Sequence, residues 1–221
     1  MLRGLFVTGT DTGVGKTVVA AALVQRYRRE FPLRYWKPIQ TGIEQDDDTA
    51  VVERLADCRP GELLTSGIRL PRPVSPHLAA RLSGTTIHLQ PLVDVPTGEA
   101  RSTRWIVEGA GGVLVPINES ETMIDLMALL GLPVVVAARS SLGTINHTLL
   151  TLEALRRRAI PIAGVVMVGD LHADNRNAIE QYGGVAVLGE MPCLRPLTAA
   201  ALSAWATQAL DLECRLASLL R

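Results

Sequence analysis

The sequence predicts an α/β fold, in which helices cover both faces of a mainly parallel sheet, and three observations lead to this expectation. Short apolar segments rich in Val, Ile and Leu alternate with segments of helical length along the 221 residues. The apolar segments are nearly continuous, as is typical of parallel strands that are buried on both faces. A glycine-rich loop separates the first apolar segment from the first helical one. We expect a single domain over residues 1–221.

The first of these units has the order strand, glycine loop, helix. The apolar run at residues 5–7 precedes the loop at residues 9–17, which reads GTDTGVGKT, and a segment of helical length follows. A phosphate-binding P-loop requires this context, because backbone N–H groups converge on phosphate oxygens at the positive end of the helix dipole. The loop departs from the pattern G-x-x-x-x-G-K-[ST] because Thr10 stands at the first glycine position. We still predict nucleotide phosphate binding, with Lys16 on the β- and γ-phosphates and Thr17 on Mg²⁺.

Further strands and helices are expected in alternation after this unit. Apolar runs predict strands at residues 34–36, 105–107, 133–138, 162–168 and 185–188. Helical spacing predicts helices at residues 49–56, 78–82, 123–130, 144–158, 178–182 and 198–220. Residues 84–102 receive no assignment, because Pro91, Pro96 and Gly98 interrupt any period.

Three candidate sites each follow an expected strand, namely the P-loop, Lys37 and Glu108. Ligands of open α/β sheets bind at the carboxyl ends of the strands, so this pattern indicates one active site. Lys37 has two interpretations, a solvated strand end or a second cation for phosphoryl transfer. Asp48 closes an acidic run that either stabilises a helix N-terminus or supplies a Mg²⁺ ligand. Glu108 is expected to end its strand in the metal-organising place of P-loop folds, and the glycines at residues 109–112 allow close backbone approach to a ligand.

The composition of the chain indicates which kinds of binding partner and which cellular compartment to expect. Equal numbers of basic and acidic residues, 22 of each, give no reason to expect nucleic acid or an anionic membrane surface as a partner. No apolar run approaches the roughly 20 residues of a membrane span. The three cysteines lack metal-ligand spacing, and the four histidines include no metal-binding pair. We therefore expect a cytoplasmic protein without a membrane segment.

Five separated segments resemble, in the same order, the motifs of the dethiobiotin synthetase family. They lie at residues 9–17, 37–42, 75–77, 107–112 and 143–147, within a similarity that covers about residues 4–194. The resemblance implies a parallel-sheet P-loop fold, a homodimer and an enzyme that requires Mg²⁺. It also implies the reaction, in which ATP drives the joining of CO₂ to 7,8-diaminononanoate. The product is the cyclic urea dethiobiotin, with ADP and phosphate, on the route to biotin.

The resemblance also implies roles for individual residues. Lys16 and Lys37 would be the catalytic residues that stabilise the transferring phosphoryl group. Magnesium would be held by Thr17, Asp48 and Glu108. The nucleotide would lie against Gly13, Val14, Gly15, Lys16, Thr17, Val18, Asp48, Glu108, Gly109, Ala110, Gly111, Pro192, Cys193 and Leu194. The diamine would be bound by Thr41 and, across the homodimer interface that forms the active site, by Gly143, Thr144 and Asn146 of the neighbouring subunit.

The chain departs from the family pattern where the nucleotide base is expected to bind. Many family members have an Asn that would hydrogen-bond adenine, and its place here falls on Val168. Residues 84–102 are also shorter than the family's helical connection, and we trace the resemblance no further than Leu194. We therefore expect weak selection between nucleotide bases, unless backbone groups near residues 167–170 or near Pro192 read adenine instead.

Two other classes of P-loop protein fit the sequence less well. A P-loop ATPase switch of the partitioning type would carry a second lysine early in the loop, where this chain has Asp11. An amidotransferase-type synthetase for a cofactor would need a glutaminase domain with a nucleophilic Cys, and the chain leaves no room for one. The dethiobiotin synthetase interpretation is therefore preferred.

Overall fold

The computed structural model, which describes residues 2–98 and 102–221, is built on a seven-stranded sheet in the order β4-β2-β6-β1-β7-β8-β9. Every strand pairing given for this sheet is parallel, as the apolar segments predict. The strands are β1 Gly4–Gly9, β2 Leu33–Trp36, β4 Leu63–Leu64, β6 Arg104–Gly112, β7 Val134–Arg139, β8 Ile162–Val168 and β9 Val187–Met191. A separate parallel pair is formed by β3 (Ile39–Thr41) and β5 (Ile68–Leu70).

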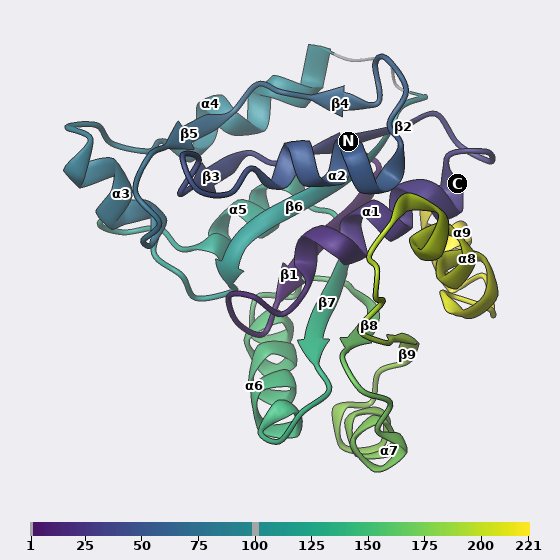
Figure 1. Cartoon of the computed structure of the whole chain (residues 1–221). Helices are drawn as coiled ribbons and strands as arrows, with labels where there is room; N and C mark the ends of the chain where they lie inside the picture. Colours follow the sequence, from purple (N-terminus) through teal and green to yellow (C-terminus); the bar gives the residue numbers. More distant parts are fainter. Residues whose placement is uncertain (1, 99–101) are drawn as a thin grey trace.

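Helices cover both faces of the sheet, as expected (Figure 1). One face packs against α1 Lys16–Tyr27, α2 Asp48–Ala56, α8 Ala199–Ala209 and α9 Arg215–Leu220. The other packs against α3 Pro76–Leu82, α4 Leu89–Asp94, α5 Met123–Leu130, α6 Thr144–Arg157 and α7 Ala173–Gly183. Alternate residues of each strand reach the two cores, because side chains along a strand point to opposite faces. In β6, for example, Ile106 joins the α1 side, whereas Trp105 and Val107 join the α5 side.

Strand β6 corrects the expectation that its strand ends at Glu108. It continues to Gly112, so Glu108 lies inside the sheet and is fully buried. The continuation follows from pairing with β1, which extends to Gly9 opposite Gly112 after a register shift. The apolar run stops at Val107, and apolar content alone does not reveal that the glycine-rich residues beyond it stay extended.

The single helix expected at residues 198–220 is wrong, because the segment is two helices. Helix α8 ends at Ala209, and the backbone turns through Asp211, which has a φ of 50°. The buried Asp211 carboxylate accepts hydrogen bonds from the backbone N–H groups of Arg215 and Leu216 at the start of α9. The Tyr27 hydroxyl donates to the same carboxylate. A polar residue that ties the turn to α1 therefore breaks the helix.

Smaller differences concern short elements. Helix α7 begins at Ala173, earlier than expected, and β9 covers residues 187–191 rather than 185–188. The strands β3, β4 and β5 were not expected, because each is only two or three residues long. Within the unassigned 84–102 region the chain forms α4 and a 3-10 turn, Val95–Gly98, while residues 99–101 lie outside the described residues. None of the described helices combines the length and apolar character needed to cross a bilayer.

Candidate active site

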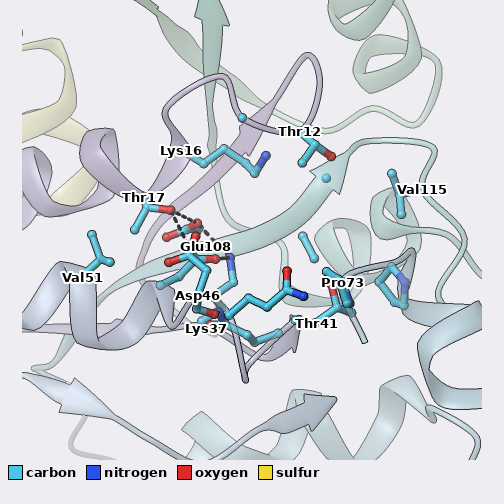
Figure 2. A pocket seen from close by; sticks show the side chains of 18 of the residues that line it. Thr12, Lys16, Thr17, Lys37, Thr41, Asp46, Val51, Pro73, Glu108 and Val115 are labelled. Carbon is cyan, nitrogen blue, oxygen red and sulfur yellow. Dashed lines mark hydrogen bonds and ion pairs between the residues drawn. The ribbon is translucent and has the colours of Figure 1, made fainter. Parts of the chain in front are cut away.

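The carboxyl ends of β1, β2 and β6 open into a cavity of about 800 Å³. These three strands are neighbours in the sheet, so the P-loop, Lys37 and Glu108 arrive at one place although they are far apart in the sequence. Figure 2 shows Lys16 and Thr17 on one side of the cavity, and Lys37 and Thr41 opposite them. Other parts of the lining come from residues within 45–51 at the start of α2, from residues 73–76, which lead into α3, and from residues within 110–115.

The P-loop owes its shape to two glycines. Gly13 and Gly15 have φ values of 71° and 93°, in the left-handed region that favours glycine. A Cβ atom on Gly15 would also lie 3.0 Å from Cγ1 of Val168, at the end of β8. The loop is therefore packed directly against the residue that stands in the expected adenine-contacting position.

Lys16 folds back over the loop and is almost fully buried. Its ammonium donates to the carbonyl of Asp11 at 2.9 Å, and the Asp11 carboxylate pairs with Arg139 at 2.6 Å. Burial and the nearby charge of Lys37 lower the pKa of Lys16, because both disfavour its charged form. A polyphosphate in the cavity would offset both effects, so the loop is suited to an anion.

A compact charged cluster forms the floor of the cavity. The Lys37 ammonium lies 2.5 Å from Asp48 Oδ2 and 2.8 Å from Glu108 Oε1. The Thr17 hydroxyl lies 2.8 Å from Asp48 Oδ1 and 3.0 Å from Glu108 Oε1, within reach of both carboxylates (Figure 2). Lys37 is only 3% exposed, so its interpretation as a solvated strand end is wrong.

The charges in this cluster hold one another ionised. Burial alone would lower the pKa of Lys37, but the negative charges of Glu108 and Asp48 outweigh it and the pKa is raised. Burial alone would raise the pKa of Asp48, but the Lys37 charge outweighs it and the pKa is lowered. A charge withdrawn from water is stable only when it is paired, and both the buried Lys37 and the half-buried Asp48 are paired.

Tyr35 belongs to the same cluster and was missed in the sequence analysis. Strands β2 and β6 pair in parallel, with Tyr35 opposite Ile106, so Tyr35 and Glu108 lie on the face that packs against α1. The Tyr35 hydroxyl donates to Glu108 Oε2 at 2.8 Å. Burial, followed by the Glu108 charge, raises the pKa of Tyr35 well above its usual value, so it remains a neutral donor. Only knowledge of the strand order would have identified this contact.

The donor set of the cluster fits a magnesium ion. It consists of one hydroxyl and two carboxylates, because the Thr17 hydroxyl lies within hydrogen-bond distance of both Asp48 and Glu108. Mg²⁺ prefers such oxygen ligands and takes one or two carboxylates, completing its shell with substrate phosphates and water. Within residues 2–98 and 102–221 no group of three His, Cys, Asp or Glu side chains is placed to hold a metal, so the nucleotide would have to complete the site.

Most of the predicted nucleotide and substrate residues line the cavity, and some do not. Those that line it are Gly13, Gly15, Lys16, Thr17, Val18, Lys37, Thr41, Asp48, Glu108, Ala110 and Gly111. Val14 does not line the cavity and is buried against Gly9. Gly109 does not line it either and packs against the ring of Phe6. The lining also includes Gln40, which sequence reasoning placed in a motif without a role.

The remaining predicted residues lie outside this cavity. Gly143, Thr144 and Asn146 are at the start of α6, beside the fully exposed Leu142. Pro192, Cys193 and Leu194 follow β9, the edge strand next to β8. A second cavity of about 390 Å³ adjoins the first and reaches His147 and Leu150 on α6.

Comparisons with known proteins show the family to which the chain belongs. A family model described as an AAA domain matches residues 3–201. The chain is 53% identical to the ATP-dependent dethiobiotin synthetase BioD of Paramagnetospirillum magneticum, over 91% of this chain and 94% of that protein. It is 45% identical to the protein of the same name from Brucella ovis, over 88% of each chain. It is also 48% identical to the biotin biosynthesis bifunctional protein BioCD of Bordetella avium, over 98% of this chain and 45% of that protein.

Solved structures of low sequence identity share the fold. A ParA family ATPase from Chlorobium tepidum superposes with a TM-score of 0.57 at 11% identity, covering 100% of this chain and 98% of that one. A MinC–MinD cell division complex from Aquifex aeolicus gives the same TM-score of 0.57, covering 99% of this chain and 95% of the matched one. At such identity the likeness extends to the fold alone.

Proposed function

The chain belongs to the family of ATP-dependent dethiobiotin synthetases, and from this premise we propose that the charged cavity carboxylates 7,8-diaminononanoate and closes the cyclic urea of dethiobiotin. The protein is thus an ATP-dependent ligase of biotin biosynthesis. One observation carries the assignment to this cavity: Lys16, Lys37 and the oxygens of Thr17, Asp48 and Glu108 surround one space at the carboxyl ends of the strands. This arrangement suits the transfer of a phosphoryl group to a second substrate.

The chemistry proceeds through an activated carbamate. One substrate amine captures CO₂ and loses a proton to give N–COO⁻, and a carbamate oxygen then attacks the γ-phosphorus while ADP leaves. The resulting carbamic–phosphoric anhydride is attacked at its carbonyl carbon by the second amine, which also loses a proton. Phosphate departs with the carbamate oxygen that had attacked, and the ring is closed. The protein contributes alignment, exclusion of water and neutralisation of charge.

The two lysines and the carboxylates divide this work. Lys16 reaches over the P-loop and stabilises the charge of the phosphates. Lys37, held 2.8 Å from Glu108, provides a second fixed cation on the opposite side of the transferring group. Magnesium bound by Thr17, Asp48 and Glu108 would neutralise further phosphate charge. Thr41 lines the cavity near Lys37, where the diamine or its carbamate would bind.

We place the far end of the diamine against a neighbouring subunit. The loop at residues 143–146 lies outside the cavity of its own chain, but its backbone begins α6, and a helix N-terminus suits the substrate's carboxylate. The full exposure of Leu142 supports a loop that faces a partner. In a homodimer each active site would then combine the cavity of one subunit with residues 143–146 of the other. Residues 192–194 border the nucleotide base in this proposal.

Product analysis tests the proposed reaction. The protein is incubated with ATP, Mg²⁺, ¹³C-labelled bicarbonate and 7,8-diaminononanoate, and the masses of the products are measured by mass spectrometry. We expect dethiobiotin with one ¹³C atom per molecule, formed in step with ADP, and no product when the diamine is omitted. ATP hydrolysis that proceeds equally well without the diamine, with no labelled product, would contradict a ligase and favour a switch ATPase.

A further inference from the structure

We propose that Tyr35 is a positioning residue, which orients Glu108 so that one oxygen of this carboxylate faces the magnesium-nucleotide complex. The inference rests on the proposed function, because it takes Glu108 to be a magnesium ligand. Tyr35 has no place in the motifs that carry the family resemblance. It enters the site through the geometry of two neighbouring strands.

The two oxygens of Glu108 have different partners. Oε1 points to the ligand side, where it lies 2.8 Å from the Lys37 ammonium and 3.0 Å from the Thr17 hydroxyl. Oε2 has a different partner and accepts a hydrogen bond from the Tyr35 hydroxyl, which lies in the core between the sheet and α1, at 2.8 Å. One donor thus holds the rear of the carboxylate, while the front remains directed at the cavity.

The sheet makes Tyr35 a rigid donor. Tyr35 is fully buried, and its ring packs in the core between the sheet and helices α1 and α2. The register between β2 and β6 places Tyr35 opposite Ile106, which is two residues before Glu108 and therefore on the same face of the sheet. Because a fully packed ring has little rotational freedom, its hydroxyl defines one orientation of the carboxylate.

Removing the hydroxyl frees the carboxylate to turn. In Tyr35→Phe, Oε2 of Glu108 would be buried without its donor, and an unsatisfied buried acceptor is costly. The carboxylate would rotate toward Lys37 and Thr17 to regain hydrogen bonds, and both groups already crowd Oε1. Partners of metal ligands typically change metal affinity or activity by about 10- to 100-fold when they are lost. We expect a loss of metal affinity in this range.

The chain offers a matched control. The Tyr27 hydroxyl is also buried and also donates to a buried carboxylate, that of Asp211, but it ties α1 to the C-terminal turn. Tyr27→Phe therefore removes the same atoms from the same kind of hydrogen bond outside the active site. Any effect of a lost buried hydroxyl on general stability appears in both variants.

Metal binding is measured directly, without turnover. Mn²⁺ is titrated into the wild-type protein and both variants in the presence of ADP, and free Mn²⁺ is followed by its electron paramagnetic resonance signal. We expect Tyr35→Phe to weaken Mn²⁺ binding by about 10- to 100-fold and Tyr27→Phe to leave it unchanged. Equal affinities in the wild-type protein and Tyr35→Phe, or equal losses in both variants, would overturn the proposal.

Glu108→Gln separates this inference from the proposed metal site. If Glu108→Gln leaves Mn²⁺ affinity unchanged, the metal site itself is misplaced. If Glu108→Gln weakens binding and Tyr35→Phe does not, only the role of Tyr35 is refuted. The double variant has no carboxylate at position 108 for Tyr35 to orient. We therefore expect it to bind Mn²⁺ as weakly as Glu108→Gln alone. An additive loss would mean that Tyr35 acts on the site by another route.

Discussion

At the scale of single residues, the site is a balance of buried charges. Lys37 forms an ion pair with both Asp48 and Glu108, and these carboxylates in turn hold Lys37 charged although it is only 3% exposed. The same three groups are among those proposed to act on the nucleotide and metal. Their buried charges are tolerated because each has a partner, and removing one partner leaves the others uncompensated.

Lys37→Ala is expected to reduce kcat by about 10²- to 10³-fold, since it removes a fixed cation beside the transferring phosphoryl group. Nucleotide binding should weaken far less, because the P-loop backbone and Lys16 remain. Steady-state kinetics with ATP and the diamine, together with calorimetric binding of ADP, measures both effects. Wild-type turnover in Lys37→Ala would remove Lys37 from the mechanism.

Acid should selectively weaken the contribution of Asp48 to stability. The folded-state pKa of Asp48 lies below its ordinary value of 3.8, so its ionised form stabilises the fold above that pH. This contribution disappears as the pH falls from 3.8 through the lowered folded-state value. Urea unfolding at about pH 6 and about pH 3 should show a stability difference between wild type and Asp48→Asn that shrinks in acid. Asp46→Asn, which removes an exposed carboxylate nearby, is the control, and a difference that grows in acid would refute the coupling.

At the scale of elements, the sequence predicted the pattern of strands and helices well and their ends less well. The strand–loop–helix unit, α5 and β8 are recognisable because their apolar runs and periods are local features. The continuation of β6 past Glu108 depends on pairing with β1, and the break between α8 and α9 depends on Asp211 contacting α1. Such long-range contacts leave no local signal.

The end of β8 carries a prediction about the nucleotide base. Val168 packs against Gly15 of the P-loop and offers no hydrogen bond to a base. One such bond contributes roughly 0.5–1.5 kcal/mol, or about 2- to 13-fold in affinity. We expect GTP and CTP to support turnover, measured as kcat/KM for each nucleotide. A preference for ATP beyond about 100-fold would contradict this expectation and would favour base reading by backbone groups.

At the scale of the whole molecule, the sheet order explains how much of the site could be anticipated. The P-loop, Lys37 and Glu108 were predicted together because each follows an apolar run, and carboxyl ends of parallel strands share one edge. Tyr35 was missed because its contact with Glu108 depends on β2 being the neighbour of β6. The loop at residues 143–146 is outside the cavity of its own chain, so the role that we propose for it requires a neighbouring subunit.

Mixing inactive subunits tests a site shared across a homodimer. Lys37→Ala removes a group inside the cavity, and Asn146→Ala removes one that we place in the partner's site. A mixed dimer can contain one site with neither lesion, so combined subunits should regain part of the wild-type activity that each variant lacks alone. Subunit exchange is followed with differently tagged chains. Exchange without any recovery would contradict the shared site.

If the P-loop transfers phosphate to a carbamate rather than to water, as proposed, the oxygen atoms of the released phosphate record the transfer. CO₂ labelled with ¹⁸O is supplied in unlabelled water, with ATP, Mg²⁺ and the diamine, and the reaction is quenched within the first turnover, before the label exchanges. Because the carbamate oxygen that attacks phosphorus leaves with it, we predict one ¹⁸O atom in each phosphate released. Hydrolysis would give phosphate without ¹⁸O in this experiment, and phosphate with ¹⁸O when the water is labelled instead. That result would contradict phosphoryl transfer to a carbamate.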